Sequence, residues 1–538
     1  MKRCPECRRD YYDDTLLYCL DDGSRLLDGP ASMDEPATAI LSDAGTLATK
    51  FPSGEPRTEV FRASAASQTE NSNSIAVLPF VNMSADVENE YFCDGLAEEL
   101  LNALAKIDDL KVAARTSAFS FKGKNTNVSE IGRMLGVKTV LEGSVRKAGD
   151  RVRITVQLVN ASDGYQMWSE RYDREMQDIF TLQDEITLAV VDALRLKLLG
   201  AEKQAVLRRH TNDPEAYQHY LRGRFFFFKR TPEGFMKAIE YFEKAIELDP
   251  EYVVAYSGLA DSYVFLGFYE MVEPKDADEK FRPFLRRAIE TDDTIVETNT
   301  SAALVRSLYD WDFHGSLEDY DRGISADPNY PFAYHLKSAI VILLGKNDEA
   351  YDLEKRAIKL DPFTPIFNAS LGWWYYLGRL NEEAIAQSKR TIEIAPNHFF
   401  AHWVLGLAYG EQRSYADAVV ALQKALALNQ FDQHIRADLG RIFGMMGERE
   451  EAEKILSEFE ELSKEKYVSA VNITKVYAGL GDREKVADWL ERACDERSVK
   501  LPWFIIDPAL DNFRDDPRVT EIRRKIGLPR IEFYETMP

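Results

Sequence analysis

Three of the five cysteines, Cys4, Cys7 and Cys19, lie near the start of the chain at a spacing that suits a metal ion. A Cys-x-x-Cys turn directs two thiolates at one point, and a tetrahedral zinc site needs two further ligands. Because Cys19 and Asp22 repeat this spacing, the sequence predicts one structural zinc ion held by Cys4, Cys7, Cys19 and Asp22. A degenerate knuckle without metal is the alternative. Residues 1–27 are too few to fold on an apolar core, so a metal here would hold structure and would not act on a substrate.

No other group of residues has the composition of a catalytic site. Cys93 lies just before a predicted helix, where a thiolate would be stabilised, but no base is identifiable beside it. Asp86, Glu88 and Glu90 lie together without a histidine or a metal ligand, as in a solvated loop. The sequence contains neither a glycine-rich phosphate loop nor a nucleophile elbow. We therefore predict that the protein is not an enzyme.

Two threonines in the next segment are candidates for phosphorylation. Residues 28–73 are rich in Ala, Ser, Thr, Pro, Glu and Gly and poor in aromatic residues, so we expect a disordered linker. A Glu-Pro-x-Thr pattern occurs there twice, ending at Thr38 and at Thr58. The second copy is similar to threonine motifs read by forkhead-associated domains, and a phosphate there would pair with arginines of a phosphothreonine-reading partner. Chance recurrence in a segment of biased composition is the alternative.

The longest part of the chain carries an internal repeat. Pro328, Pro362 and Pro396 recur every 34 residues, with Leu-Gly pairs and alanines at constant offsets between them. A unit of this length buries its apolar face only against copies of itself, which predicts a solenoid of helix pairs. The pattern resembles the tetratricopeptide repeat family, and we expect about eight repeats over residues 213–500.

Two departures from the repeat are expected. One copy carries an extra stretch near Glu270–Asp278, which we interpret as a loop. Residues 501–538 resemble the terminal segment of many bacterial repeat proteins and predict a cap. In this cap, apolar Trp503–Ile506 would cover the last open face, and a charged helix through Glu521–Lys525 would meet water.

Residues 74–200 predict a small α/β domain. Ile75–Phe80 is an apolar run typical of a buried strand, and a helix follows to Ile107 with Asp94 as its cap. Gly149 and Asp150 separate two alternating runs, as in a β-hairpin. The predicted elements after the first helix are strand Leu110–Ala114, helix Val128–Leu135, the hairpin strands Thr139–Lys147 and Arg151–Val159, strand Tyr165–Tyr172 and helix Ile179–Leu199.

Two of these segments resemble known families. Residues 75–199 resemble the TolB amino-terminal-like domain found ahead of tetratricopeptide repeats, on the motifs Ala76-Val-Leu-Pro-Phe80, Tyr91-Phe-Cys-Asp-Gly95, Leu141-Glu-Gly-Ser-Val145 and Trp168-Ser-Glu-Arg-Tyr-Asp173. This resemblance implies a non-catalytic sensing or assembly domain. Residues 1–27 resemble the short zinc ribbon of bacterial regulatory proteins but lack one of its four cysteines. The predicted fold class is therefore multidomain: a zinc-ribbon-like knuckle on a disordered linker, a small α/β domain, and an all-α solenoid with its cap.

The resemblance to tetratricopeptide repeats also implies a partner-binding groove. In that family the first helix of each repeat lines the concave face, and partners contact fixed positions of it. Because aromatic side chains contribute much of the energy of interfaces, we expect these residues to contact a protein or peptide. The alternative for Trp373 and Trp403 is that they pack between neighbouring repeats. The predicted partner-binding residues are Phe332, His335, Trp373, Tyr376, Phe400, Trp403 and Arg441.

Charge and hydropathy limit the partner class and the location. The formal net charge of −23 argues against a nucleic-acid or anionic-membrane surface spread over the whole chain. No apolar run is long enough to cross a bilayer and no signal peptide is evident, so we expect a cytoplasmic protein. We expect a non-catalytic scaffold or signalling adaptor. The alternative is a transcription-linked regulator whose ribbon contacts nucleic acid through Lys2, Arg3, Arg8 and Arg9.

Overall fold

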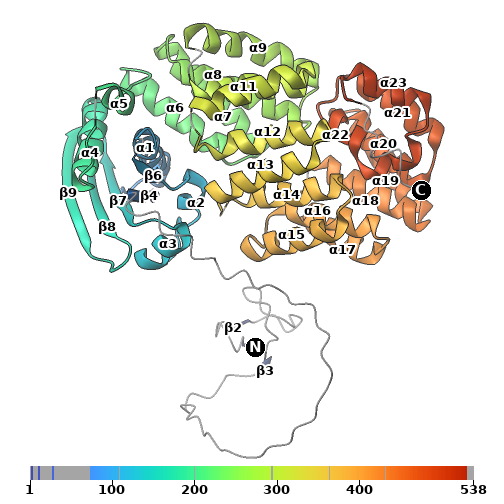
Figure 1. The fold of residues 1–538 in the computed structure, drawn as a ribbon, viewed down its shortest axis with the longest axis horizontal. Helices are drawn as coiled ribbons and strands as arrows, with labels where there is room; N and C mark the ends of the chain where they lie inside the picture. Colours follow the sequence, from blue (N-terminus) through green and yellow to red (C-terminus); the bar gives the residue numbers. More distant parts are fainter. Residues whose placement is uncertain are drawn as a thin grey trace, which may run out of the picture. The chain divides into compact units, whose positions relative to one another are not determined.

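A computed structural model describes residues 73–529, except residues 108, 199, 293, 294, 327, 363 and 431, together with three short strands near the amino terminus (Figure 1). The chain divides into two compact units, residues 1–68 and 69–538. In the first unit, β1 (Lys2–Arg3) pairs antiparallel with both β2 (Asp10–Tyr11) and β3 (Leu27–Asp28). The predicted zinc ligands Cys4, Cys7, Cys19 and Asp22 and the threonines Thr38 and Thr58 lie outside the described residues.

The second unit begins with an α/β domain built on a mixed sheet. The strand order is β6-β4-β7-β8-β9, and β5 also pairs with β7. Its parallel pairs join β4 to β6 and to β7, whereas β7, β8 and β9 pair antiparallel through the predicted hairpin at Gly149. The strands are β4 (Asn73–Val77), β5 (Val81–Asn82), β6 (Leu110–Val112), β7 (Thr139–Ala148), β8 (Arg151–Asn160) and β9 (Gln166–Glu175).

Helices cover both faces of this sheet. On one face, α1 (Glu90–Leu104) and α4 (Ile179–Ala193) share a core with the apolar side of β8, and on the other α2 (Arg115–Phe119) and α3 (Val128–Leu135) enclose a smaller core. The predicted cap at Asp94 is wrong, because α1 begins at Glu90 and Asp94 lies buried within it, bonded to Lys122. The predicted helix Ile179–Leu199 is too long, because α4 ends at Ala193, and neither α5 (Gly200–Val206) nor α2 was predicted.

A series of helix pairs follows, and the described residues contain eight of them. First helices begin at Pro331, Pro365, Phe399 and Gln433, so the period of 34 residues is confirmed. The predicted loop at Glu270–Asp278 is too long, because α9 already begins at Pro274 and the extra residues lengthen that helix. The pairs are α6 (Pro214–Phe227) with α7 (Pro232–Leu248), α8 (Val253–Phe268) with α9 (Pro274–Thr291), α10 (Val296–Val305) with α11 (Phe313–Ala326), α12 (Pro331–Leu343) with α13 (Asn347–Leu360), α14 (Pro365–Leu377) with α15 (Asn381–Ile394), α16 (Phe399–Glu411) with α17 (Tyr415–Leu428), α18 (Gln433–Met446) with α19 (Arg449–Leu462), and α20 (Ala470–Leu480) with α21 (Arg483–Asp495).

The array closes on itself through contacts between its early and late repeats. Asn472 of α20 donates to the carboxylate of Glu270, which follows α8, at 2.8 Å. The ammonium of Lys500 lies 5.6 Å from the ring centre of Phe268 at the end of α8. These contacts join residues more than two hundred positions apart, so the repeats curl around an interior.

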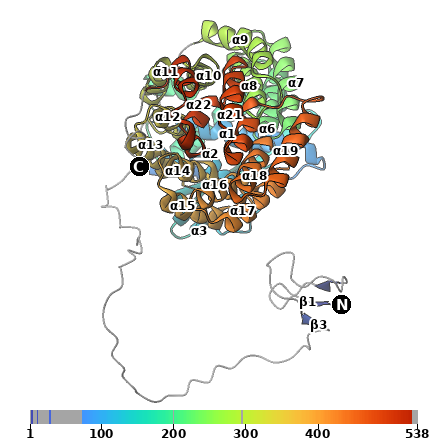
Figure 2. The ribbon, with the colours of Figure 1, turned by 90° about the vertical axis from the view of Figure 1, so that its right-hand side faces the viewer.

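The carboxy-terminal segment occupies that interior and is more than an end cap. It consists of α22 (Leu501–Ile506), a 3-10 turn η4 (Pro508–Phe513) and α23 (Pro517–Lys525). In the last repeat, α23 packs on α21 and η4 on α20, whereas α22 reaches α12, four repeats upstream, as Figure 2 shows. The segment therefore packs on the last repeat, as a cap would, and in addition reaches a repeat far upstream.

Candidate partner-binding surfaces

The structure buries three of the seven residues predicted to bind a partner. Tyr376, Trp403 and Arg441 are each at most 4% exposed to solvent. Phe332, His335, Trp373 and Phe400 are half-buried. In this conformation Tyr376, Trp403 and Arg441 contact the chain itself, so the interpretation of these three as partner contacts does not hold.

The aromatic residues of the inner face pack between neighbouring repeats. The ring centre of Trp373 lies 5.5 Å from that of Trp403 in the next repeat and 5.6 Å from that of Phe400. It also lies 6.3 Å from Trp503 of the carboxy-terminal segment. Packing between repeats, the alternative predicted for both tryptophans, is therefore what the structure shows.

Phe332 and His335 have partners of the same kind. Their rings lie 5.1 and 5.0 Å from that of Phe367, on the next first helix. His335 also places Nδ1 3.0 Å from the buried carboxylate of Glu354. These side chains join adjacent repeats through aromatic contacts and one polar contact.

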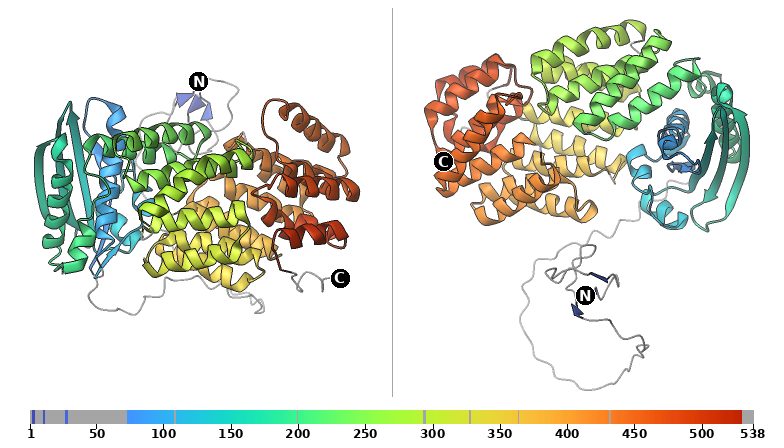
Figure 3. Two further views of the ribbon diagram at one scale, coloured as in Figure 1. Left: turned by 90° about the horizontal axis from the view of Figure 1, so that it is seen from above. Right: turned by 180° about the vertical axis from the view of Figure 1, so that it is seen from behind.

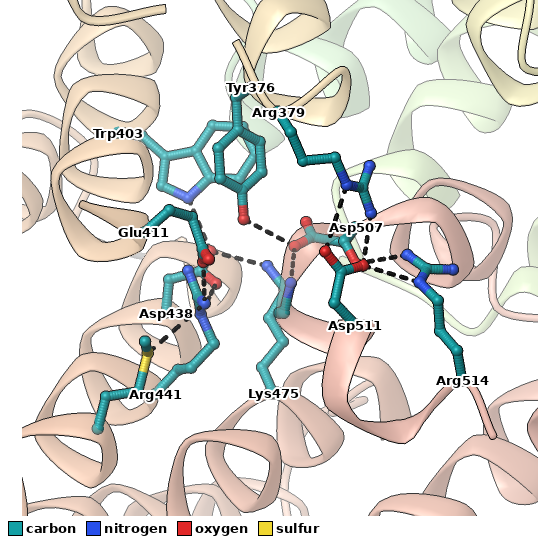
Figure 4. A network of polar contacts seen from close by, with 12 residues as sticks. Tyr376, Arg379, Trp403, Glu411, Asp438, Arg441, Lys475, Asp507, Asp511 and Arg514 are labelled. Atoms are coloured by element: carbon teal, nitrogen blue, oxygen red, sulfur yellow. Dashed lines mark hydrogen bonds and ion pairs between the residues drawn. The ribbon is translucent and has the colours of Figure 1, made fainter. Parts of the chain in front are cut away.

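A buried network of charges lies beside the tryptophans (Figure 4). Asp438 accepts hydrogen bonds from Trp403 Nε1 at 2.8 Å and from Lys475 Nζ at 2.7 Å. Arg441 donates to Glu411 at 2.7 Å, and its Nε lies 3.7 Å from Asp438. Burial lowers the pKa of Lys475, although Asp438 opposes this shift. The two cations are stable here because carboxylates lie within reach of both.

The carboxy-terminal segment completes this network. Tyr376 donates its hydroxyl hydrogen to Asp507 at 2.7 Å, and Arg379 makes an ion pair with Asp511 at 2.6 Å. Burial raises the pKa of Asp507, while Arg441 and Lys475 act in the opposite direction. Figure 4 shows Asp507 facing Tyr376 of α14, and Asp511 facing Arg379 just after that helix.

The burial of this segment makes it a part of the core. Trp503, Phe504, Ile505 and Ile506 are each at most 7% exposed. Burying a side chain of this size contributes about 1.5–3 kcal/mol, so these four contribute about 6–12 kcal/mol. That is as much as the whole stability of a typical domain, and a peptide ligand that displaced the segment would have to replace it. The inner face is therefore closed to a partner in this conformation.

The residues considered for catalysis have structural partners. Burial, with Glu90 and Asp94 nearby, raises the pKa of Cys93 to about 12, so its thiol stays protonated at neutral pH. Glu90 and Asp94 both bind Lys122, at 2.7 and 2.6 Å. Within the described residues, no three histidine, cysteine or acidic side chains gather as they would around a metal ion.

The α/β domain is locked to the repeats through α1 and α2. Figure 3 shows α1 between the sheet and α6. Gly95 permits this approach, because a Cβ at that position would lie 2.7 Å from the side chain of Leu221. Glu98, which is 5% exposed, pairs with Arg115 of α2 and Arg224 of α6. The two parts therefore form one body with a continuous outer surface at their junction.

Part of that outer surface gathers stacked rings and cations. The rings of Phe226 on α6 and Tyr241 on α7 are parallel within 7°, with centres 5.6 Å apart. His219 continues the stack at 5.9 Å from Tyr241. We call this surface the junction patch, and it consists of Arg222, Phe226, Lys229, Lys237, Tyr241 and Lys244.

The cations of the junction patch rest on its rings. Lys229 and Lys237 lie 4.5 and 4.9 Å from the centre of Phe226, and Lys244 lies 5.3 Å from that of Tyr241. Arg222 lies 4.6 Å from the ring of Tyr91 in α1, so the patch spans both parts of the junction.

None of these four cations has a carboxylate within ion-pair distance among the residues that the structure describes. Most other arginines in this part of the chain do have one. Burial, followed by the nearby charges of Arg222 and Lys244, lowers the pKa of His219. Four cations without a carboxylate partner among the described residues therefore surround the stacked rings, in a chain whose net charge is −23.

This surface was not predicted from the sequence. The sequence feature that could have indicated it is the run Phe225-Phe-Phe-Phe-Lys-Arg230. Within this run, only Phe227 is buried in the structure. The lysines of α7 lie one turn apart from Tyr241, at the spacing of one helix face. What the sequence could not show is that α6 and α7 stack their rings on one another.

The fold thus defines a helix-hairpin repeat protein with an α/β domain fixed to its first repeat. A family model for the tetratricopeptide repeat matches residues 236–252, which cover most of α7 and the turn after it. The model that matches the α/β domain describes the second domain of HilA/YgeH-like transcriptional regulators and covers residues 70–189. The resemblance to the TolB amino-terminal-like domain stays a prediction.

One relative and several solved structures are similar to parts of the chain. A Rhizobium meliloti (strain 1021) protein named "Putative adenylate cyclase 3" is 43% identical over 187 residues, which are 35% of this chain and 32% of that protein. The crystal structure of MamA is 22% identical and covers 29% of this chain and 91% of its own, with a TM-score of 0.25. The crystal structure of TTC0263 from Thermus thermophilus is 19% identical and covers 38% of this chain and 99% of its own, with a TM-score of 0.31.

These likenesses are partial. The chain spans less than half the length of the curated relative, and the name of that relative describes the relative alone. At such TM-scores the evidence for the repeat architecture is the chain's own helix pairs, together with the family model. None of the described helices combines the length and apolarity that crossing a bilayer requires.

Proposed function

We propose that this protein is a non-catalytic interaction scaffold that binds an acidic segment of a partner protein on the junction patch. The observation that carries the proposal is the set of four cations, Arg222, Lys229, Lys237 and Lys244, that lie over aromatic rings and have no carboxylate partner among the described residues. The inner face of the repeats does not serve this purpose, because the carboxy-terminal segment fills it.

The geometry favours an acidic polypeptide over a nucleic acid. Single-stranded nucleic acids bind by stacking their bases on free ring faces. In the junction patch Phe226 and Tyr241 stack on one another, His219 stacks on Tyr241, and lysines lie 4.9 and 5.3 Å from the two ring centres. Carboxylates can reach such lysines from the side, with the rings as an apolar floor.

The surrounding charge supports the same choice. A phosphate backbone extends well past any single patch, and the net charge of −23 disfavours the approach of a long polyanion. Glu240, Glu243 and Glu247 lie on α7 beside the patch, and burial, followed by repulsion from the other two carboxylates, raises the pKa of Glu243. A short acidic segment can avoid these residues, whereas a long polyanion cannot.

The test uses the full-length chain and a fluorescent peptide of about twenty glutamates with interspersed leucines as the probe. We expect binding that weakens with added salt, because exposed charges are screened at high ionic strength. The double variant Lys237→Glu/Lys244→Glu should lose about tenfold or more in affinity, since two attractive contacts become repulsive.

The matched control is Lys389→Glu/Lys424→Glu, two exposed lysines whose replacement changes the net charge by as much as the double variant of the patch. Lys389 is also an exposed lysine over a tyrosine ring, 5.7 Å from Tyr409, but it lies on the outer face of a distant repeat. This variant should bind like the wild type. Equal loss in both variants would show that net charge alone controls binding and would overturn the proposal, as would tighter binding of an oligothymidylate of equal length.

A transcription-linked regulator is the second candidate, favoured by the match of residues 70–189 to a domain of HilA/YgeH-like transcriptional regulators. We propose that any nucleic-acid contact of this kind uses the amino-terminal knuckle through Lys2, Arg3, Arg8 and Arg9. Retention of the full-length chain on DNA that disappears when Arg8 and Arg9 become glutamate would support it. Retention that is unchanged in this variant would exclude the knuckle as the contact.

A further inference from the structure

Strand β9 forms an open edge of the sheet in the α/β domain. It is the last strand in the sheet order, it is ten residues long, and Figure 1 shows it at the outer rim of the domain. Ser169, Glu170 and Arg171 in its middle are exposed. Among the described residues, no backbone hydrogen bond reaches the outer side of this strand. An edge of this kind is a template for a further strand.

The charges along β9 are complementary to themselves when the strand is reversed. Counting outward from Tyr172, the first neighbours are Arg171 and Asp173, and the second neighbours are Glu170 and Arg174. At these two positions, each charge on one side has the opposite charge on the other side. Edges that only resist aggregation need no such antisymmetry, because charge of a single sign is sufficient.

We propose that β9 pairs antiparallel with β9 of a second copy of this chain, about a two-fold axis at Tyr172. In this register Arg171 lies opposite Asp173 of the other copy, and Glu170 lies opposite Arg174. Because the interface is symmetric, each pair occurs twice. The two sheets then join into one continuous sheet that spans the dimer.

The groups that this register uses are accessible at the surface. Arg171 has no ion-pair partner among the described residues, so its charge is available to another copy. Asp173 already binds Arg151 and Arg153, at 2.8 and 2.6 Å, but keeps a third of its side chain exposed. Glu170 accepts a hydrogen bond from Tyr172 at 3.0 Å and is otherwise open to solvent.

The pairing makes the scaffold bivalent. The junction patch lies on α6 and α7, away from β9, so a dimer formed through β9 would present two patches. Two linked sites bind a partner with repeated acidic segments more tightly than one. The dimer itself rests on β9 and is independent of whether the junction patch binds anything.

The experiment is sedimentation velocity on the full-length chain over a range of concentrations. We expect a monomer–dimer equilibrium. In Glu170→Arg, two attractive pairs become repulsive Arg–Arg pairs, and in Arg174→Glu they become Glu–Glu pairs. Each variant alone should dimerise about tenfold more weakly or worse than the wild type, because cross-strand charge pairs contribute appreciably to sheet pairing.

Mixing the two variants separates this register from general effects of charge. In a mixed pair, the arginine introduced at position 170 of one copy faces the glutamate introduced at position 174 of the other, and the native Arg174 and Glu170 face each other at the second site. The mixture should therefore dimerise more tightly than either variant alone. The exposed ion pair of Arg174 with Glu185 is lost in one variant, so circular dichroism of each variant checks that the fold is intact.

Arg146→Glu is the matched control, since Arg146 is exposed on β7, an interior strand of the same sheet. It should dimerise like the wild type. A wild-type chain that stays monomeric at the highest attainable concentration would overturn the proposal. So would single variants that dimerise as well as the wild type, or a mixture that associates no better than its components.

Discussion

The buried network on the inner face allows a quantitative prediction for Asp438→Asn. Asparagine keeps the shape of the side chain and can still accept the hydrogen bond from Trp403, but it removes the charge that faces Lys475. Lys475 is 2% exposed, and among the described residues Asp438 is the one carboxylate within ion-pair distance of it. Removing one partner of a buried ion pair costs about 3–5 kcal/mol, and we expect that loss here.

Lys475→Met should cost less, because it leaves Asp438 with Trp403 and with Arg441 at 3.7 Å. The double variant Asp438→Asn/Lys475→Met replaces the pair by groups that need no charge. It should be more stable than Asp438→Asn alone, with a coupling free energy of about 2 kcal/mol or more.

The pH dependence of the stability of Asp438→Asn also tests whether the charge of Lys475 causes the loss. Burial already lowers the pKa of Lys475 from 10.5, and loss of Asp438 lowers it further. Between the folded pKa and 10.5 the unfolded chain binds more protons than the folded one, so stability rises with pH in this window. The deficit of Asp438→Asn should therefore shrink as the pH is raised toward about 10.

The assay is urea unfolding followed by circular dichroism, with hydrogen exchange of α20 and α22 to locate the loss. A deficit below about 1 kcal/mol in Asp438→Asn would refute the reasoning, since it would place this carboxylate in the range of an exposed pair. A double variant as unstable as the sum of the two single variants would refute it as well.

Two further predictions concern the junction and the amino-terminal unit. Although burial acts in the opposite direction, Arg115 and Arg224 lower the pKa of Glu98 below 4.5. The loss of stability in Glu98→Gln should therefore be complete above about pH 4.5 and should vanish as the pH falls through the folded pKa. Urea midpoints of wild type and variant at neutral pH and at about pH 3 measure this difference, and a difference that persists in acid would contradict the prediction. Atomic emission spectrometry should find one zinc ion per chain, and the variant Cys19→Ser should lose it. Chelation of the metal should leave the melting temperature of residues 69–538 unchanged, because these residues form a separate unit. Full zinc content in Cys19→Ser would refute the predicted ligand set.

Much of the repeat array could be predicted from the sequence. The constant offset between Pro328, Pro362 and Pro396 requires equal helix pairs, and the first helices at Pro331 and Pro365 begin where the period places them. Such features depend on local preferences of proline, glycine and alanine, which act in the same way in every copy.

Element ends were less predictable than element types. Asp94 has the residue type of a helix cap, but Lys122 from a distant loop binds it inside α1. Residues near Pro274 look like an insertion, yet they extend α9 because proline is favoured in the first turn of a helix. In the first case a contact with a residue distant in the sequence decided where Asp94 lies. In the second case the same residues were compatible with either a loop or a helix.

By itself the sequence determined the helix-pair period, the α/β segment before it and the apolar character of the inner face. The tertiary structure alone decided what that face touches. Curvature of the array brings α12 and α14 within reach of α22, so Trp373 and Tyr376 meet the chain's own carboxy-terminal segment and not a partner. The same applies to the junction patch and to β9. The sequence shows that their side chains are aromatic or charged. Whether those side chains are buried depends on how successive elements are rotated relative to one another, and small rotations add up along the chain.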